Sequence, residues 1–390
     1  MKKTGFILIS VLLIFSTVFL IGCSTEKASE PSEVTRLELS TDSDCYPVYH
    51  SLDSEGQRIY GVLYDAMEQH NDNEITIGVY KTESELKDAV DWINKNYRLI
   101  AYELPDFFWV NPYKINLKEI KSVGEYRLNA LLSYTLSKEE YISARNRYNT
   151  EVERIVSEAK SFPYLFDRVL YVHDEILSGT EYDEALPEDD SRALELSAYG
   201  ALVSGKTVCS GYTLAFTSIM QKLNIECGAE FDTPDNFSVI GGHVWNYCRL
   251  EDDYYYFDLT WDDTGFDSEA YKPYMDYGHC YFAVSADELS NSNFTMQDDA
   301  PTPDCNGTKY NYFVYNNMSF SDYDYDKVKA SIEQQKDNKY IALRFDSYGG
   351  LIEAEADLME EKKIYDILTD IDSLTYVTAK SGLHLYIFPK

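Results

Sequence analysis

Apolar residues recur at helical spacing along much of the chain. Apolar positions three or four residues apart mark one buried face of a helix. This spacing predicts helices over 59–67, 83–97, 137–161 and 165–176. The third of them opens with Ser137 and Glu140, which have the form of a capping box, and it contains neither glycine nor proline. Alternating or continuous apolar positions predict strands over 75–80 and 107–110.

Beyond Pro301 and Pro303 the pattern changes to strands and helices in turn. Strands are predicted over 310–315, 340–345, 374–378 and 383–388, and helices over 325–334 and 351–368. Strands that alternate with helices over so short a length indicate a small α/β unit, which we place at 305–390. The residues before the central motifs, 45–160, are predicted to form a mainly helical α+β extension.

The first residues have the pattern of an exported protein. A lysine pair precedes an apolar run over 6–21, and Gly22-Cys23 follows it. A positive start, a short apolar stretch and small residues at the cut indicate a secretory signal over 1–22, and the run is too short to favour a spanning helix. The motif Leu-Ile-Gly-Cys also resembles the lipobox of bacterial lipoproteins, in which the cysteine is lipidated. An ordinary signal peptide with a cysteine nearby is the alternative.

A lipid on Cys23 would anchor the chain at the outer face of a bacterial membrane. The segment 23–44 is rich in Ser, Thr, Glu and Asp and has no apolar period, so it is predicted to be a flexible spacer. We therefore expect an extracytoplasmic, membrane-anchored protein whose ordered part begins near Cys45.

The amino-acid composition of the chain disfavours some classes of binding partner. The formal net charge of −33 argues against nucleic acid, whose phosphates attract a basic surface. Tyrosine is frequent, and packing in half-buried strands explains it better than contacts with carbohydrate or peptide. The seven cysteines show no CxxC spacing, so we expect neither a metal site nor a redox pair, and no cofactor. Disulfides and buried free thiols both remain open for them.

Cys209 is the first candidate for chemistry. It follows a loop that begins at Gly205, and apolar positions then mark one face of a helix: Tyr212, Ala215, Phe216, Ile219 and Leu223. Cys209 is therefore predicted at the start of a buried helix. There the unpaired N–H groups and the positive end of the helix dipole favour a thiolate and can stabilise an oxyanion. A simple buried thiol is the alternative.

A β-hairpin is predicted to bring His243 and Asp258 together. Two aromatic runs flank a polar pair, Glu251-Asp252. If these two residues form the turn, Trp245 faces Asp258 across the strands. Asp258 then lies on the same face as His243, as its diagonal neighbour at about 7–8 Å between backbones. A three-residue turn would move Asp258 to the opposite face.

With these positions, the three residues suit nucleophilic catalysis. Cys209 would attack an acyl carbon, His243 would take the thiol proton and later donate it to the leaving group, and Asp258 would orient the imidazole. Taken singly, His243 could be an ordinary edge histidine and Asp258 a capped strand end. Their joint occurrence favours the catalytic interpretation.

The motifs around these residues resemble those of the transglutaminase-like superfamily. Cys-Ser-Gly-Tyr at a helix start precedes Gly-His-Val-Trp-Asn and then Phe-Asp-Leu-Thr-Trp-Asp-Asp, in the order of that family. The upstream motifs Tyr-Val-His-Asp, Tyr-Asp and Ser-Ala-Tyr-Gly-Ala-Leu are similar too, so the resemblance covers roughly 165–285. It implies a papain-related α+β core, placed at 161–295, whose cysteine helix packs on an antiparallel sheet. The motifs fix no second oxyanion donor; Tyr199 is a candidate.

An acidic group follows the predicted aspartate: Asp262, Asp263, Asp267 and Glu269. Its spacing does not fit an EF-hand loop, and the calcium sites of animal cross-linking enzymes cannot be carried over by the resemblance. A solvated acidic loop is the interpretation we favour here.

The resemblance implies acyl chemistry through a thioester and leaves the reaction open. Hydrolysis of peptide or protein amides at the cell surface, including cell-wall peptides, is the first hypothesis, and transglutaminase-type cross-linking is the second. A non-catalytic surface-binding module is the competing class. A solute-binding lipoprotein is disfavoured by the motifs.

Overall fold

The computed structural model describes residues 45–185, 190–232, 242–264, 274–290, 302–379 and 382–390. The predicted leader, with Cys23 and the spacer 23–44, lies outside these ranges. All described residues belong to one compact unit, Arg36–Lys390. Helices and strands both build it, so the α+β class is confirmed. Within the described ranges, no helix has the length and apolar character needed to cross a bilayer.

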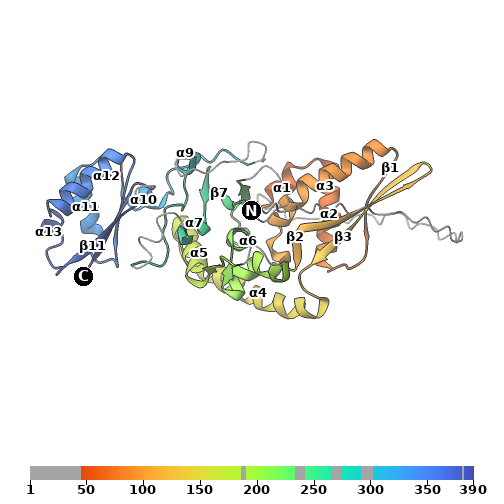
Figure 1. Cartoon of the computed structure of the whole chain (residues 1–390), viewed down its shortest axis with the longest axis horizontal. Helices are drawn as coiled ribbons and strands as arrows, with labels where there is room; N and C mark the ends of the chain where they lie inside the picture. Colours follow the sequence, from red (N-terminus) through yellow and green to blue (C-terminus); the bar gives the residue numbers. More distant parts are fainter. Residues whose placement is uncertain (1–44, 186–189, 233–241, 265–273, 291–301, 380–381) are drawn as a thin grey trace, which may run out of the picture. The chain divides into compact units, whose positions relative to one another are not determined.

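The N-terminal region combines three helices with a three-stranded antiparallel sheet (Figure 1). Its elements are α1 (Pro47–Ser51), α2 (Ser54–Glu68), β1 (Ile75–Tyr80), α3 (Glu83–Glu103), β2 (Val110–Ser122) and β3 (Glu125–Tyr134), in the sheet order β1-β3-β2. The predicted helices and strand β1 are confirmed.

The strand predicted over 107–110 is wrong. Pro105–Phe107 forms a 3-10 turn instead, and the strand begins only at Val110. The long β2–β3 hairpin has no counterpart among the predicted elements. Most of the β2 side chains beyond its first residues are exposed or half-exposed. The strand therefore shows little of the alternation between apolar and polar residues by which a strand is recognised in a sequence.

Two helices, α4 (Lys138–Ala159) and α5 (Leu165–Gly179), lead into the central part of the chain. The Ser137 side chain accepts a hydrogen bond from the Glu140 N–H, and the Glu140 carboxylate accepts one from the Ser137 N–H, which confirms the capping box. On α5, the predicted stripe at Val169, Val172 and Ile176 is buried.

The central part places one buried helix against an antiparallel sheet. The helix is α6 (Cys209–Lys222), and the sheet consists of β6 (Cys227–Phe231), β7 (Val244–Leu250) and β8 (Asp253–Phe257) in the order β6-β7-β8. Asn246 of β7 fastens the two together. Its amide donates to the Thr213 carbonyl oxygen over 3.1 Å and to the Thr217 hydroxyl over 2.9 Å. The predicted packing of the cysteine helix on a sheet is therefore confirmed.

The N-terminal region and the central part share one hydrophobic cluster. It runs in sequence from Ile59 to Tyr310 and includes the fully buried side chains of Trp109, Tyr148 and Phe216. A polar contact inside it joins α4 to α6, because the Tyr148 hydroxyl lies 2.8 Å from the Ser218 hydroxyl. The residues before α5 therefore help to fix the position of α6.

The C-terminal unit is a four-stranded sheet with helices. Its elements are α10 (Tyr312–Tyr315), β9 (Ser319–Phe320), α11 (Tyr325–Gln335), β10 (Ile341–Phe345), α12 (Tyr348–Glu355), α13 (Ile364–Ile367), β11 (Leu374–Ala379) and β12 (His384–Pro389), in the sheet order β11-β12-β10-β9. Helices α11 and α12 contact β10, and they lie beside the sheet that contains β11 (Figure 1). The helix predicted over 325–334 and the strands predicted over 340–345, 374–378 and 383–388 are confirmed, and the bounds 305–390 of the unit stay a prediction.

Two elements of that unit differ from prediction. The segment 310–315 is not a strand but ends in helix α10, because the Asn311 carboxamide accepts the N–H groups of Phe313 and Val314. The helix predicted over 351–368 does not stay α-helical after α12, because Ala356–Glu360 forms a π-helix. It is then interrupted at Lys362, whose φ of 64° lies in the left-handed region.

Gly211 allows the first turn of α6 to pack closely on its neighbours. A Cβ at this position would lie 1.8 Å from the Thr207 hydroxyl oxygen and 2.9 Å from the Ser197 carbonyl oxygen. We expect Gly211→Ala to lower the free energy of unfolding by about 1–3 kcal/mol, because the added methyl group overpacks a buried site. Urea denaturation measures the change.

Gly179 provides the matched control, since nothing lies within 4 Å of a Cβ built on it. Gly179→Ala should leave the stability close to that of the wild type. Equal stability for both variants would show that the close approach around Gly211 relaxes at little cost.

Candidate functional site

Cys209 is the first residue of α6, as predicted, and its side chain is half-exposed. Val208 occupies the N-cap and supplies no side-chain hydrogen bond to the first turn. The N–H groups at this helix start are thus not capped by a side chain, and those of Gly211 and Tyr212 donate to the Val208 carbonyl oxygen. The thiol lies where the helix dipole favours a negative charge.

The hairpin has the register on which the predicted site depends. Leu250 pairs with Asp253 and Tyr247 with Tyr256, so the turn is the two residues Glu251-Asp252. One step beyond the last pair, the same register sets Trp245 opposite Asp258. The two-residue turn is therefore confirmed.

His243 and Asp258 meet as this register requires. The distance from His243 Nε2 to Asp258 Oδ2 is 2.6 Å, and Asp258 is only 1% exposed. The second carboxylate oxygen of Asp258 accepts the Trp261 N–H over 3.0 Å. Both oxygens are therefore held, which fixes the direction from which the carboxylate contacts the imidazole.

The surroundings of His243 favour its charged form. Burial lowers the pKa of His243, but the charge and hydrogen bond of Asp258, together with a contact with Cys209, raise it to about 10. Since Asp258 occupies Nε2, the other ring nitrogen, Nδ1, is left for the thiol. The structure thus brings Cys209, His243 and Asp258 together in one chain of contacts.

Two tryptophan rings border the imidazole. The ring of Trp245 lies stacked at 5.6 Å from that of His243, and the ring of Trp261 lies at 5.9 Å, both measured between centroids. Bulky apolar rings of this kind exclude water from the His243–Asp258 pair and strengthen its electrostatic interaction.

The acidic residues after Asp258 are not a solvated loop. Asp262 is fully buried and Asp263 is 8% exposed, on helix α7 (Leu259–Thr264). The Tyr212 hydroxyl donates to Asp263 Oδ2 over 2.7 Å, which ties α6 to α7. The interpretation as exposed acids was therefore wrong for these two residues, because each carboxylate has a buried polar partner; Asp267 and Glu269 lie outside the described residues.

A buried histidine, His173 on α5, is the partner of Asp262. His173 Nε2 lies 3.0 Å from Asp262 Oδ2, and His173 Nδ1 lies 2.9 Å from Asp174 Oδ1. His279 Nε2 reaches the same Asp174 oxygen over 2.8 Å. Sequence reasoning missed this network, although the motif Tyr-Val-His-Asp on a helical stripe carries its first two members.

The network has the geometry of ion pairs. His173, Asp174 and His279 offer ligand atoms within 4.8 Å of one another, a spacing that could hold a metal ion. Both ring nitrogens of His173 already contact carboxylate oxygens, however, as expected for an imidazolium. Burial lowers the pKa of His173, but the hydrogen bonds and charges of Asp174 and Asp262 raise it to about 9.

The pKa of His173 predicts how the free energy of unfolding changes with pH. The value in an unfolded chain is about 6.5, so folding favours the protonated ring. The resulting stabilisation is complete below pH 6.5 and disappears as the pH rises through 9. We expect His173→Gln to be much less stable than the wild type near pH 6.5 and to approach it near pH 9.5. Urea denaturation across this range tests the expectation, and a stability difference that does not vary with pH would contradict it.

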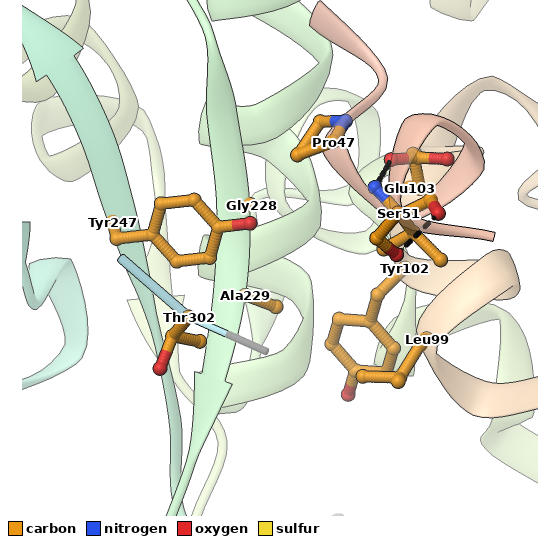
Figure 2. Close-up of a pocket in the computed structure, with 10 residues that line it drawn as sticks. Pro47, Ser51, Leu99, Tyr102, Glu103, Gly228, Ala229, Tyr247 and Thr302 are labelled. Carbon is orange, nitrogen blue, oxygen red and sulfur yellow. Dashed lines mark hydrogen bonds between the residues drawn. The ribbon is translucent and has the colours of Figure 1, made fainter. Parts of the chain in front are cut away.

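A pocket lies between the N-terminal region and the edge strand β6. It encloses about 430 Å³, part of it open to solvent. Figure 2 shows Tyr247 on one side and Tyr102 with Leu99 on the other, with Gly228 and Ala229 between them. Cys209 is not among the described residues that line it.

Tyr102 connects this pocket with the cysteine. Burial raises the pKa of Tyr102, and the charge of Cys209 raises it further, as it does for Tyr113. Both tyrosines come from the N-terminal region, so two side chains outside the recognised motifs lie close to the thiol. Sequence patterns give no signal for them, because only the tertiary fold brings α3 and β2 to the start of α6.

Tyr199, the predicted candidate for oxyanion stabilisation, is buried at 4% exposure. Its ring packs at 5.0 Å from that of Phe108, and the Arg147 guanidinium lies 5.5 Å above it. These contacts are made by the ring, and they indicate no role for the hydroxyl group. The assignment of Tyr199 as an oxyanion donor therefore stays a prediction.

Comparisons with known proteins agree with this arrangement. Residues 151–259 match the sequence profile of the transglutaminase-like superfamily. This segment contains Cys209, His243 and Asp258, and it ends at the first residue of α7. No curated protein matches the chain.

Two solved structures are similar to part of the chain. One is a transglutaminase, with 15% identity over 38% of this chain and 44% of the other, at a TM-score of 0.25. The second is a candidate cysteine protease from Cytophaga hutchinsonii, with 14% identity over 39% of this chain and 63% of the other, at a TM-score of 0.23. The chain thus covers less than two thirds of each. The motifs, their geometry and the profile match agree that residues 151–259 form a transglutaminase-like domain.

Proposed function

We propose that this protein is an extracytoplasmic, lipid-anchored enzyme that hydrolyses peptide or protein amides through a thioester on Cys209. The observation that carries the proposal is the pairing of His243 with the buried Asp258 carboxylate, in contact with a thiol at a helix start. A cysteine nucleophile needs a base next to its thiol and a third group that orients the base. A histidine with a purely structural role has no need of a half-exposed thiol beside its ring.

The geometry supports a two-step reaction. In the first step the Cys209 thiolate attacks the carbonyl carbon, and the electrons of the C=O bond move to the oxygen. The oxyanion collapses, the C–N bond breaks, and protonated His243 gives its proton to the leaving amine. In the second step water attacks the thioester, His243 accepts a proton from it, and the acid leaves as the thiolate is restored. Asp258 keeps the imidazole oriented throughout.

The proposed location rests on the leader pattern, which ends at Cys23. An enzyme at the outer face of a bacterial membrane meets peptides and proteins, and cell-wall peptides are among them. Metabolic labelling with a palmitate analogue tests the anchor. Label on the wild type that is lost in Cys23→Ser supports it, and an unlabelled wild type found in the medium refutes it.

Acylation by an activated ester tests the chemistry. With 4-nitrophenyl acetate, the proposal expects a burst of nitrophenolate and the mass of one acetyl group on the peptide that contains Cys209. A chain with no acyl adduct would instead be a binding module. Adding primary amines then separates the two reactions: an amide product in place of acetate indicates transamidation rather than hydrolysis.

A further inference from the structure

Two tyrosine hydroxyl groups of the N-terminal region meet close to the start of α6. Tyr102 is the next-to-last residue of α3, and Tyr113 lies near the beginning of β2. Their hydroxyl oxygens are 2.5 Å apart, the distance of a short hydrogen bond. The Tyr113 backbone is fixed in turn, because its N–H donates to the Asn111 side chain over 2.9 Å.

Several contacts tie this hydroxyl pair to the candidate site. The Tyr102 ring packs edge-on against Phe231 at 5.1 Å, and Phe231 pairs with Val244, the residue after His243. Tyr113 lies beside Ser210, the residue after Cys209. The Ser210 side chain is buried, so the hydroxyl pair reaches the first turn of α6.

We propose that the Tyr113 hydroxyl, oriented by Tyr102, is the second donor to the oxyanion that forms when Cys209 attacks a carbonyl. The first donor would be an N–H group in the uncapped first turn of α6. This inference rests on the proposed acyl chemistry and adds to it a catalytic residue from outside the segment that matches the family profile, 151–259.

The hydroxyl has the right properties for a donor. Burial is the main cause that raises the pKa of Tyr113 to about 12, so the group keeps its proton at neutral pH. The Arg98 guanidinium, 4.1 Å above the Phe231 ring, is a positive charge close enough to act on both tyrosine hydroxyls. A buried donor aimed at a developing negative charge acts most strongly where water is excluded.

The test compares two reactions of the same thiol in the full chain. Acylation by 4-nitrophenyl acetate passes through an oxyanion, whereas alkylation by iodoacetamide does not. Tyr113→Phe should slow acylation roughly 10- to 100-fold and leave alkylation near the wild-type rate. Tyr102→Phe removes only the orienting hydrogen bond, so acylation should fall about 5-fold, again without a change in alkylation.

Tyr134 offers the matched control. It lies on the neighbouring strand β3, and its hydroxyl contacts the backbone oxygens of Ala66 and Asn71 at 3.1 Å each. Tyr134→Phe also deletes a bonded hydroxyl from this region, and it should change neither rate by more than the error of measurement.

The outcomes separate this inference from the proposed function. Acylation of Tyr113→Phe at the wild-type rate would overturn the role of Tyr113 and leave the thioester chemistry intact. Equal losses of acylation and alkylation would mean that Tyr113 only supports the local structure, which also overturns its role as a donor. A wild type that is alkylated but never acylated would remove the proposed function itself.

Discussion

Replacing Cys209 with alanine should abolish acyl transfer. We expect Cys209→Ala to lower the acylation rate roughly 10⁴-fold or more, because no other group in the site can form the thioester. The fold should persist, since the side chain is half-exposed and loses only one sulfur atom. The measurement is the nitrophenolate burst, combined with mass spectrometry of the acylated peptide.

Cys280 is a close control for this variant. Cys209 and Cys280 are the two half-exposed cysteines among the described residues, where the remaining ones are buried. Cys280 Sγ lies 3.0 Å from the hydroxyl of Tyr386, which belongs to the C-terminal strand β12. Cys280→Ala should keep the full burst. An acyl group found on Cys280, or a burst that survives in Cys209→Ala, would disprove the assignment of the nucleophile.

Replacing Asp258 with asparagine should have the second largest effect. The amide keeps the size of the carboxylate but removes the charge that holds the imidazole protonated. Without that charge, burial dominates and the pKa of His243 falls well below its value of about 10. We expect acylation to slow roughly 10³- to 10⁴-fold, in line with the loss of an orienting carboxylate in other triads.

The pH dependence of alkylation gives an independent measure of the same change. In the wild type, imidazolium persists from neutral pH up to about 10, so a positive charge faces the thiol and promotes its alkylation throughout that range. In Asp258→Asn that charge should be lost at a lower pH. Asp253→Asn, at the exposed first position of β8, the strand that precedes Asp258, should leave the profile unchanged. Identical profiles for the wild type and Asp258→Asn would show that Asp258 does not set the charge of His243.

The sequence was sufficient to predict the central site because its constraints are local. The turn at Glu251-Asp252 fixes the hairpin register, and a period of two then decides which side chains share a face. Helix α6 likewise begins at Cys209, where the glycine loop ends. Each of these features depends on residues that are close in sequence.

Other features depend on contacts between distant segments, and these could not be predicted. His173 meets Asp262 from a helix 89 positions earlier in the chain, and no pattern around Asp262 distinguishes a buried acid from an exposed one. Tyr102 and Tyr113 likewise reach the site only through tertiary packing. The exposed strand β2 escaped prediction because alternation is visible only when one face is buried.

The ion pair of His173 and Asp262 also limits how this protein can diverge. Changing one partner leaves a charge buried without compensation, which typically costs about 3–5 kcal/mol, whereas an apolar pair of matching volume can be neutral or stabilising. Single substitutions at either position should therefore be eliminated by selection. Related proteins are expected to keep both residues or to have exchanged both, so that the two positions vary together across the family.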